Sequence, residues 1–268
     1  MRGEASCLVV LLLLAGCATS GGPIRGGSLR LDTATAGCGA GNAAACVAQY
    51  GKEVASVAAV TNAVKGALDT PKPPALDWLT RQSIEEVLVK CADTARSDVL
   101  LWHAADFTNG RPTAAECKQL STDPKYKGKT WAQQLGIEMH DEARKCAEAA
   151  LDKLVPGRFS LEQRYRFDRD TKQKKPVSAD EEKALVESGN SGELKGSLVP
   201  DVVIHTGDLL AVQAVYDFKF NCANDGPQPR WTRYCEGHPY EDMGQDEMYE
   251  EAFGVEPATV SPRWGINR

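Results

Sequence analysis

Apolar and polar positions alternate most clearly in the last third of the chain. Residues 198–205 and 209–220 follow this period-two pattern and predict two strands. Thr206-Gly207-Asp208 lies between them, and Gly207 supplies the permissive backbone that a tight hairpin turn requires. Residues 159–167 alternate in the same way and predict a further strand. We therefore expect a β-hairpin and at least one more strand in a C-terminal unit.

Earlier in the chain the apolar residues recur at helical spacing. Over 84–91 they follow Ser83, which we expect to be the N-cap of a helix, with Glu86 three residues on. A second helix is predicted over about 130–154 and ended by Pro156-Gly157. Helices followed by strands predict an α/β (α+β) fold.

The start of the chain follows neither pattern. Arg2 precedes an apolar run, Leu8 to Leu14, that is too short to span a bilayer, since a span needs about 20 residues. Residues 1–16 therefore have the form of a signal peptide. The ending Leu14-Ala15-Gly16-Cys17 resembles a bacterial lipobox, which implies lipidation of Cys17. The alternative is a plain secretory signal with a chance cysteine. Ala18, by similarity to enteric lipoproteins, favours the outer membrane.

The rest of the chain divides by composition. Residues 17–75 are rich in Gly and Ala and end in Pro71-Lys72-Pro73-Pro74, as expected of a lipidated tether with a small-residue helix. That helix is either a packed spacer or a membrane contact. A helical region is predicted over 76–129, and the C-terminal unit over 130–268.

Overall composition is that of a folded protein, with 42% hydrophobic and 25% charged residues. The net charge of −6 excludes a surface that is basic throughout, so an enzyme of nucleic acid would need locally concentrated positive charge. The densest positive stretch is 158–175, with seven basic residues against three acidic ones. It is either a solvated surface or a nucleic-acid contact.

Cysteine usage agrees with export. Without Cys7 and Cys17, seven of the nine cysteines remain, an odd number. Local bridges are predicted for Cys38–Cys46 and for Cys222–Cys235, and other pairings stay open. The chain has no C-x-x-C pair, which disfavours a zinc site.

The two predicted C-terminal strands also carry the candidate chemistry. Alternation places Asp217 and Lys219 on one face, opposite an apolar face. The hairpin folds Asp201 back to within about one or two residues of register with Asp217. Two carboxylates beside a lysine can hold a hard cation next to a charge that orients water.

This arrangement resembles the PD-(D/E)xK nuclease superfamily, which has the restriction-endonuclease-like fold, over about residues 130–268. Pro200-Asp201 matches the first element and Asp217-Phe218-Lys219 the second. The resemblance implies a small mixed sheet flanked by helices, and Mg²⁺ (or Mn²⁺) held by the two acids and the backbone carbonyl of Phe218. Lys219 would position or activate the attacking water.

Two further segments extend the resemblance. Gln245 and Tyr249, one helical turn apart, are similar to the Q-x-x-x-Y motif of the RecB-like branch, which contacts substrate or supports the site. The family often takes another acid from a preceding helix, where Glu138 or Glu142 could serve, although both could be ordinary surface residues. Residues 258–262 could form a closing strand.

A segment inserted after Lys219 departs from the family pattern. It carries Arg230, Trp231 and Arg233, which suit phosphate contact and base stacking, and a packed, disulfide-closed loop is the equal alternative. A competing mechanism is a metal-independent ribonuclease that uses His205 and His238 as acid and base.

Export joined to a nuclease resembles the polymorphic toxins of inter-bacterial competition. A lipobox with a nuclease domain is most similar to the lipoprotein toxins that myxobacteria pass to neighbours. The resemblance implies a nucleic-acid substrate (DNA or RNA) in the cytoplasm of target cells, a membrane contact through the lipid, and a cognate immunity protein. A non-catalytic envelope lipoprotein that uses the fold for binding is the alternative.

Overall fold

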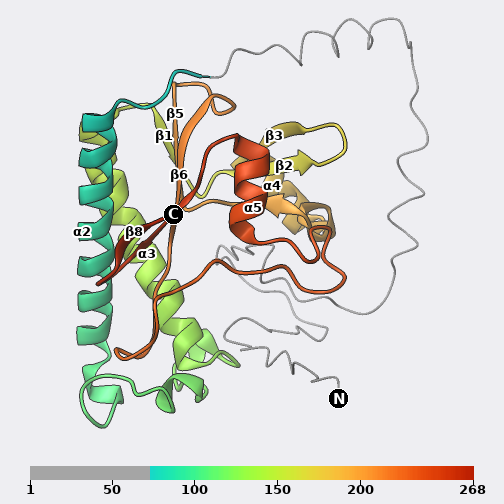
Figure 1. The fold of residues 1–268 in the computed structure, drawn as a ribbon. Coiled ribbons are helices and arrows are strands. Elements are labelled where there is room, and N and C mark those ends of the chain that lie inside the picture. The colour runs from blue at the N-terminus through green and yellow to red at the C-terminus, as the bar shows by residue number, and fades with distance from the viewer. Residues whose placement is uncertain (1–72) are drawn as a thin grey trace, which may run out of the picture.

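Two long helices run along one side of the protein in the computed structural model, which describes residues 73–268 (Figure 1). Helix α2, Trp78–Trp102, starts after Asp77, whose side chain accepts a hydrogen bond from the Thr80 amide at 2.9 Å. The predicted N-cap, Ser83, was wrong. It lies inside the helix and donates to the Leu79 carbonyl, because Asp77 already caps the helix further upstream.

The second predicted helix is confirmed. Helix α3, Trp131–Leu154, begins after Thr130, and the side chains of Thr130 and Gln133 cap each other's backbone amides reciprocally. Between the two long helices lie only short 3-10 turns. They are η1 (Ala104–Asp106), η2 (Glu116–Lys118) and η3 (Pro124–Tyr126).

A mixed five-stranded sheet packs against these helices and makes the fold α+β. Its order is β1-β5-β6-β7-β8, and only the β6–β7 pair is parallel among its strands. The predicted hairpin is confirmed as β5 and β6, with Gly207 at a φ of 111° in the turn. The strand predicted over 198–205 is shorter than expected, because Leu198 belongs to β4 in a second sheet and β5 begins only at Val202. The predicted closing strand is confirmed as β7. The bounds are β1 Phe159–Leu161, β5 Val202–His205, β6 Val212–Phe218, β7 Ala258–Ser261 and β8 Gly265–Asn267.

The strand predicted over 159–167 is in fact two strands in two sheets. Glu162 interrupts it at a φ of 48°, a left-handed conformation that cannot continue a strand. After it, β2 joins a separate three-stranded sheet of order β3-β2-β4. The remaining elements are β2 Arg164–Asp168, β3 Gln173–Val177, α4 Ala179–Glu187, η4 Ser191–Leu194, β4 Ser197–Leu198 and α5 Gln245–Phe253.

Strand β6 is buried on both faces, so it lies at the centre of the molecule. Figure 1 shows α2 and α3 on one side of its sheet and α5 with β2 and β3 on the other. Ala214, Tyr216 and Phe218 point into the core formed with α2 and α3, while Val215 points toward α5. Helix α2, predicted in the region 76–129, thus shares one hydrophobic core with the C-terminal sheet.

Within residues 73–268, two disulfides connect distant segments. Cys91–Cys146 joins α2 to α3, and Cys117–Cys222 joins the segment between those helices to the chain after β6. The predicted Cys222–Cys235 bridge was wrong, because the chain leaves β6 toward Cys117 instead of closing on itself. The predicted Cys38–Cys46 bridge, the signal peptide, Cys17 and the tether lie outside the described residues. No helix within 73–268 is long and apolar enough to cross a membrane.

Candidate functional site

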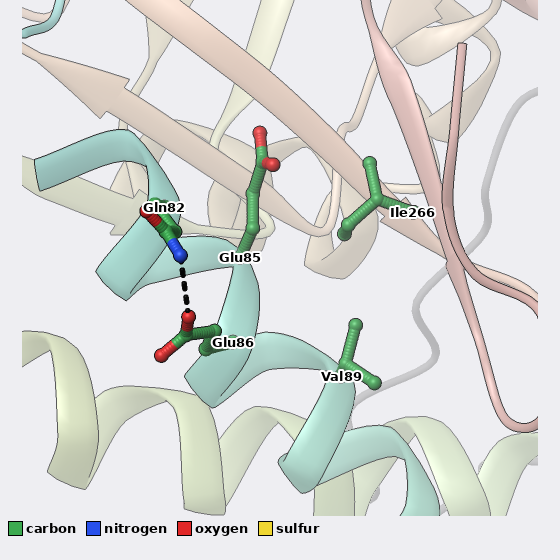
Figure 2. Close-up of a pocket in the computed structure, with 5 residues that line it drawn as sticks. All are labelled: Gln82, Glu85, Glu86, Val89 and Ile266. Carbon is green, nitrogen blue, oxygen red and sulfur yellow. Dashed lines mark hydrogen bonds between the residues drawn. The ribbon is translucent and has the colours of Figure 1, made fainter. Parts of the chain in front are cut away.

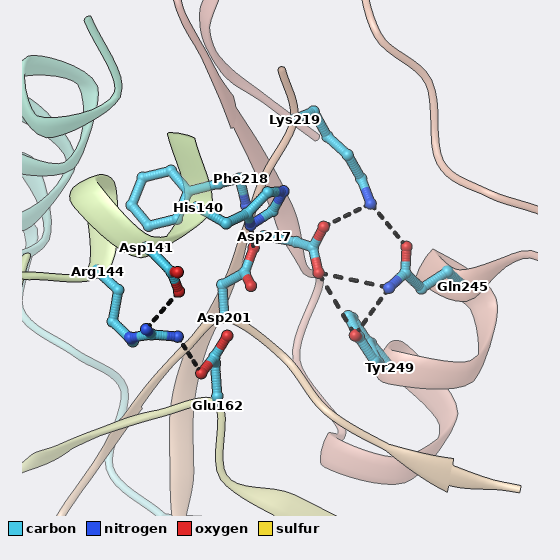
Figure 3. Close-up of polar contacts among 10 residues, drawn as sticks. All are labelled: His140, Asp141, Arg144, Glu162, Asp201, Asp217, Phe218, Lys219, Gln245 and Tyr249. Atoms are coloured by element: carbon cyan, nitrogen blue, oxygen red, sulfur yellow. Dashed lines mark hydrogen bonds and ion pairs between the residues drawn. The ribbon is translucent and has the colours of Figure 1, made fainter. Parts of the chain in front are cut away.

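Asp201 and Asp217 meet at one end of the β5–β6 hairpin. Val202 pairs with Tyr216, and continuing this register places Asp201 opposite Asp217. The Asp201 carboxylate accepts a hydrogen bond of 2.6 Å from the Phe218 amide (Figure 3). The hairpin thus brings the two acids together, as the register predicted.

Lys219 completes this end of the hairpin. Its ammonium lies 2.5 Å from the Asp217 carboxylate and donates to the Gln245 side-chain carbonyl at 2.8 Å. Asp217 is only 4% exposed, so the ion pair stands in a largely water-free environment where charge interactions are strong. Lys219 therefore connects the end of β6 to helix α5 through its charged ammonium group.

Helix α5 contributes both polar side chains that the sequence singles out. Gln245, its first residue, donates to the Tyr249 hydroxyl at 2.9 Å. The Gln245 amide and the Tyr249 hydroxyl each lie 3.4 Å from the same Asp217 oxygen (Figure 3). Both residues are at most 1% exposed. This network fixes the orientation of the Asp217 carboxylate.

His140 of α3 joins the site and was not predicted. Its Nδ1 lies 3.3 Å from the Asp201 carboxylate, and its ring contacts Phe220 edge-on. Burial disfavours the charged imidazolium, but the Asp201 carboxylate outweighs this and raises the pKa of His140 above its usual value. The pKa of Asp201 is lowered: burial opposes its charge, and His140, Lys219 and the Phe218 amide favour it.

A signal for His140 was present in the sequence. The family pattern points to an acid on the helix before the first strand, and His140 is the only histidine of 130–154. Glu138 instead binds His103 at 2.6 Å, and Glu142 pairs with Lys145 at 2.6 Å. The predicted helix acid is therefore replaced at the site by an imidazole, because the helix turns Glu138 away from Asp201.

A second charged group borders Asp201 and was also missed. The Glu162 amide donates to the Asp201 carbonyl at 3.0 Å, and its left-handed backbone turns the chain beside the site. Its carboxylate pairs with Arg144, which also binds Asp141 at 2.6 Å (Figure 3). A strained residue next to a charged cluster is typical of a functional site.

The inserted segment after Lys219 contributes a wall. Lys219 lies 5.3 Å from the centre of the Trp231 ring, which packs edge-on against Tyr249. Arg233 donates to the Asp242 carbonyl, and Arg230 is exposed. Of the two alternatives for this segment, Trp231 therefore fits the packed loop, and the two arginines lie at the surface.

The two histidines of the competing mechanism belong to separate local clusters. His205 contacts the Ser160 hydroxyl at 3.0 Å and accepts from the Gly207 amide in the hairpin turn. His238 stacks on Tyr234, with ring centres 4.4 Å apart. Both imidazoles serve local structure, so this geometry does not favour an acid–base pair.

The basic stretch 158–175 is largely neutralised by neighbouring acids. Its strand β2 and hairpin turn face carboxylates of α4 and α5. This favours the solvated-surface interpretation over a nucleic-acid contact. The pairs are Arg164–Glu182 at 3.1 Å, Arg166–Glu181 at 2.5 Å, Arg169–Glu251 at 3.2 Å and Lys172–Glu251 at 2.7 Å.

The donor set at the hairpin end suits a divalent cation. Asp201 and Asp217 supply oxygen, His140 supplies nitrogen, and the Phe218 carbonyl lies between the acid and the lysine in sequence. Carboxylates and carbonyls suit Mg²⁺ and Mn²⁺, and an imidazole is compatible with Mn²⁺. Among residues 73–268, no three His, Cys, Asp or Glu side chains stand close enough to hold an ion in this arrangement. Lys219 occupies the position beside Asp217 instead.

A groove of about 340 Å³ lies elsewhere, between α2 and β8 (Figure 2). Its polar side chains are engaged locally: Gln82 donates to Glu86 at 3.0 Å, and Glu85 accepts from Tyr216 at 3.0 Å. We find no chemistry there that competes with the hairpin end.

No protein-family model, curated protein or solved structure matches the chain.

Proposed function

We propose that residues 130–268, packed with α2, form a metal-dependent nuclease of the PD-(D/E)xK type that hydrolyses phosphodiester bonds of DNA or RNA. One observation carries the proposal. Asp217 and Lys219 stand side by side opposite Asp201, and Gln245 and Tyr249 hold them from α5.

Each side chain has a role in such a reaction. Mg²⁺ or Mn²⁺, held by Asp201, Asp217 and the Phe218 carbonyl, would lower the pKa of a bound water and neutralise phosphate charge, while His140 holds the Asp201 carboxylate from α3. Lys219 orients the attacking water with its ammonium. Gln245 accepts a hydrogen bond from Lys219, and this contact sets the direction of the ammonium. Burial excludes bulk water around Asp217.

The setting of this activity is also a proposal. Lipidation of Cys17 would anchor the exported protein at the outer membrane, where its own cell offers no substrate. A toxin that acts in the cytoplasm of competitor cells, with a cognate immunity protein protecting kin, accounts for an anchor joined to a nuclease. Its support is the resemblance of the leader and of the Asp201 and Asp217-Phe218-Lys219 elements.

Cleavage by the chain from residue 18 onward tests the activity. Plasmid DNA and folded RNA are each incubated with Mg²⁺, Mn²⁺ or EDTA. We expect cation-dependent cleavage, and a loss of at least about 100-fold in Asp217→Asn and in Lys219→Met. The exposed residues of α4 offer matched controls, Asp180→Asn and Lys183→Met, which should cleave at the wild-type rate.

Equal cleavage by wild type and Lys219→Met would refute the site. A folded wild-type chain that cleaves neither nucleic acid, and that does not harm cells when expressed in their cytoplasm, would favour the non-catalytic envelope lipoprotein.

A further inference from the structure

Two arginines from distant parts of the sequence line one surface cleft, and a third stands near them. Arg111, between α2 and α3, and Arg263, in the β7–β8 turn, line an open cleft of about 460 Å³. Arg96 of α2 stands close to both. The remaining lining residues are Pro112, Thr113, Asn224 and Asp225.

The three guanidinium groups repel one another. Burial lowers the pKa of Arg96 first, and the charges of Arg111 and Arg263 lower it further. Asp93 acts in the opposite direction, and Asp225 lines the cleft. An anion bound between like charges gathered in this way would relieve their repulsion.

The basic stretch 158–175 provides the contrast. There the arginines of β2 and its turn reach carboxylates of α4 and α5. Within the part of the chain that the structure describes, no carboxylate lies within 4.0 Å of the charged atoms of Arg96, Arg111 or Arg263. Arg263 donates to the Asn224 carbonyl, a residue that also lines the cleft, and lies 4.9 Å from the centre of the Trp264 ring.

The cleft lies at the same end of the sheet as the candidate site. Strands β6 and β7 run parallel, and the Lys219 amide donates to the Val260 carbonyl at 2.9 Å. Arg263 follows Val260 by three residues, and Asn224 follows Lys219 by five. The Cys117–Cys222 disulfide holds the chain after Lys219 against the segment that carries Arg111.

We propose that this arginine cleft (Arg96, Arg111 and Arg263) binds backbone phosphates of a nucleic-acid strand that reaches Asp201 and Asp217. The inference rests on the proposed function for its choice of ligand. Guanidinium groups bind phosphate oxygens in a bidentate manner, and a row of them follows a backbone without reading its bases. The cleft therefore supplies the local positive charge that a protein of net charge −6 needs to hold a polyanion.

Binding measured without cleavage tests the cleft. The chain from residue 18 onward, carrying Lys219→Met, is titrated into fluorescein-labelled 20-nucleotide DNA and RNA at several salt concentrations. Arg111→Gln with Arg263→Gln should weaken binding by about tenfold. The slope of log Kd against log salt should fall by about 1.4, which is 0.7 for each of two lost phosphate contacts on a single strand. Arg96 is left unchanged because it is half-buried.

Two further variants sharpen the comparison. Arg166→Gln with Arg169→Gln removes the same charge from the ion-paired stretch and should leave the affinity within about twofold. Arg111→Lys with Arg263→Lys keeps the charge and should retain the salt slope, which separates electrostatics from misfolding.

Equal losses of affinity in the cleft pair and the control pair would overturn the proposal, as would a parent Lys219→Met chain that does not bind the oligonucleotides. Inorganic phosphate that displaces them at equal concentration would make the cleft a small-anion site. Arginine-dependent binding to phosphatidylglycerol vesicles in place of the oligonucleotides would make it a membrane contact. Either result overturns the proposal. Binding through the cleft by a chain that never cleaves would refute the nuclease alone.

Discussion

Two polar clusters lie on opposite sides of helix α3, and they differ in how their charges are satisfied. Glu138 belongs to one and His140 to the other, two residues apart and therefore about 200° apart around the helix. In the first, His103 binds Glu138 at 2.6 Å and Asp106 at 2.9 Å, one carboxylate on each ring nitrogen. In the second, His140 approaches Asp201 at the end of the hairpin.

The His103 cluster is a closed structural contact. Both ring nitrogens are engaged, and Gln134 binds the remaining oxygen of Glu138 at 3.0 Å. It connects the end of α2 to α3. A partly buried imidazole with both ring nitrogens occupied stabilises the contact between the helices and offers no position to a ligand.

The Asp201 cluster has an excess of carboxylates. Asp141, Glu162, Asp201 and Asp217 face only two strongly basic side chains, Arg144 and Lys219, together with His140. A histidine–carboxylate contact alone therefore does not mark a functional site. Unbalanced charge at a strand end, held in place by groups from several elements, is the more specific feature.

Asp201→Asn should produce the largest loss of cleavage, and it tests whether the Asp201 cluster, unlike the His103 cluster, is needed for activity. The asparagine carbonyl can still accept from the Phe218 amide, so we expect the fold to persist while the charge is lost. Cleavage should fall by at least about 100-fold. Cleavage rates and urea unfolding are measured together. A stability loss large enough to explain the lower activity would show that Asp201 is structural.

Glu138→Gln should show the opposite behaviour. It removes the charge that His103 binds, and we expect the free energy of unfolding to fall by about 2 kcal/mol. The cleavage rate of the folded fraction should stay at the wild-type value, because Glu138 faces away from Asp201. Lost cleavage at unchanged stability would instead restore Glu138 as a metal ligand, the role suggested by the sequence.

The smallest expected effect is a pH dependence of stability from His103. Burial lowers its pKa, but Asp106 and Glu138 outweigh burial, so the pKa in the folded state lies above 6.5. The cluster therefore stabilises the fold fully below pH 6.5, and this contribution is lost as the pH rises through the higher folded value.

Urea unfolding from pH 5 to 9 measures this contribution as the difference between wild type and His103→Gln. The difference should shrink as the pH rises. The subtraction is needed because the raised pKa of His140 gives wild type a second contribution of the same sign. A difference that grows with pH would contradict the assignment to His103.

Sequence alone determined the features that depend on neighbouring residues. Period-two alternation placed Asp217 of β6 and Lys219, which directly follows the strand, on the same face. The short turn at Gly207 set the register of Asp217 with Asp201. Helical spacing likewise predicted Gln245 and Tyr249 one turn apart on α5. These inferences succeed because strand and helix periodicity is local, and because a tight turn leaves few registers.

Only the tertiary structure decided which distant segments meet. It turned His140 toward Asp201 and Glu138 toward His103, and it paired Cys222 with Cys117 across 105 positions. Acids of α4 pair with the basic stretch that stood out in the sequence, and Arg111 and Arg263, with Arg96 nearby, come together at one cleft. A charge's role depends on its partners and its exposure to water, and both follow from how remote segments pack together.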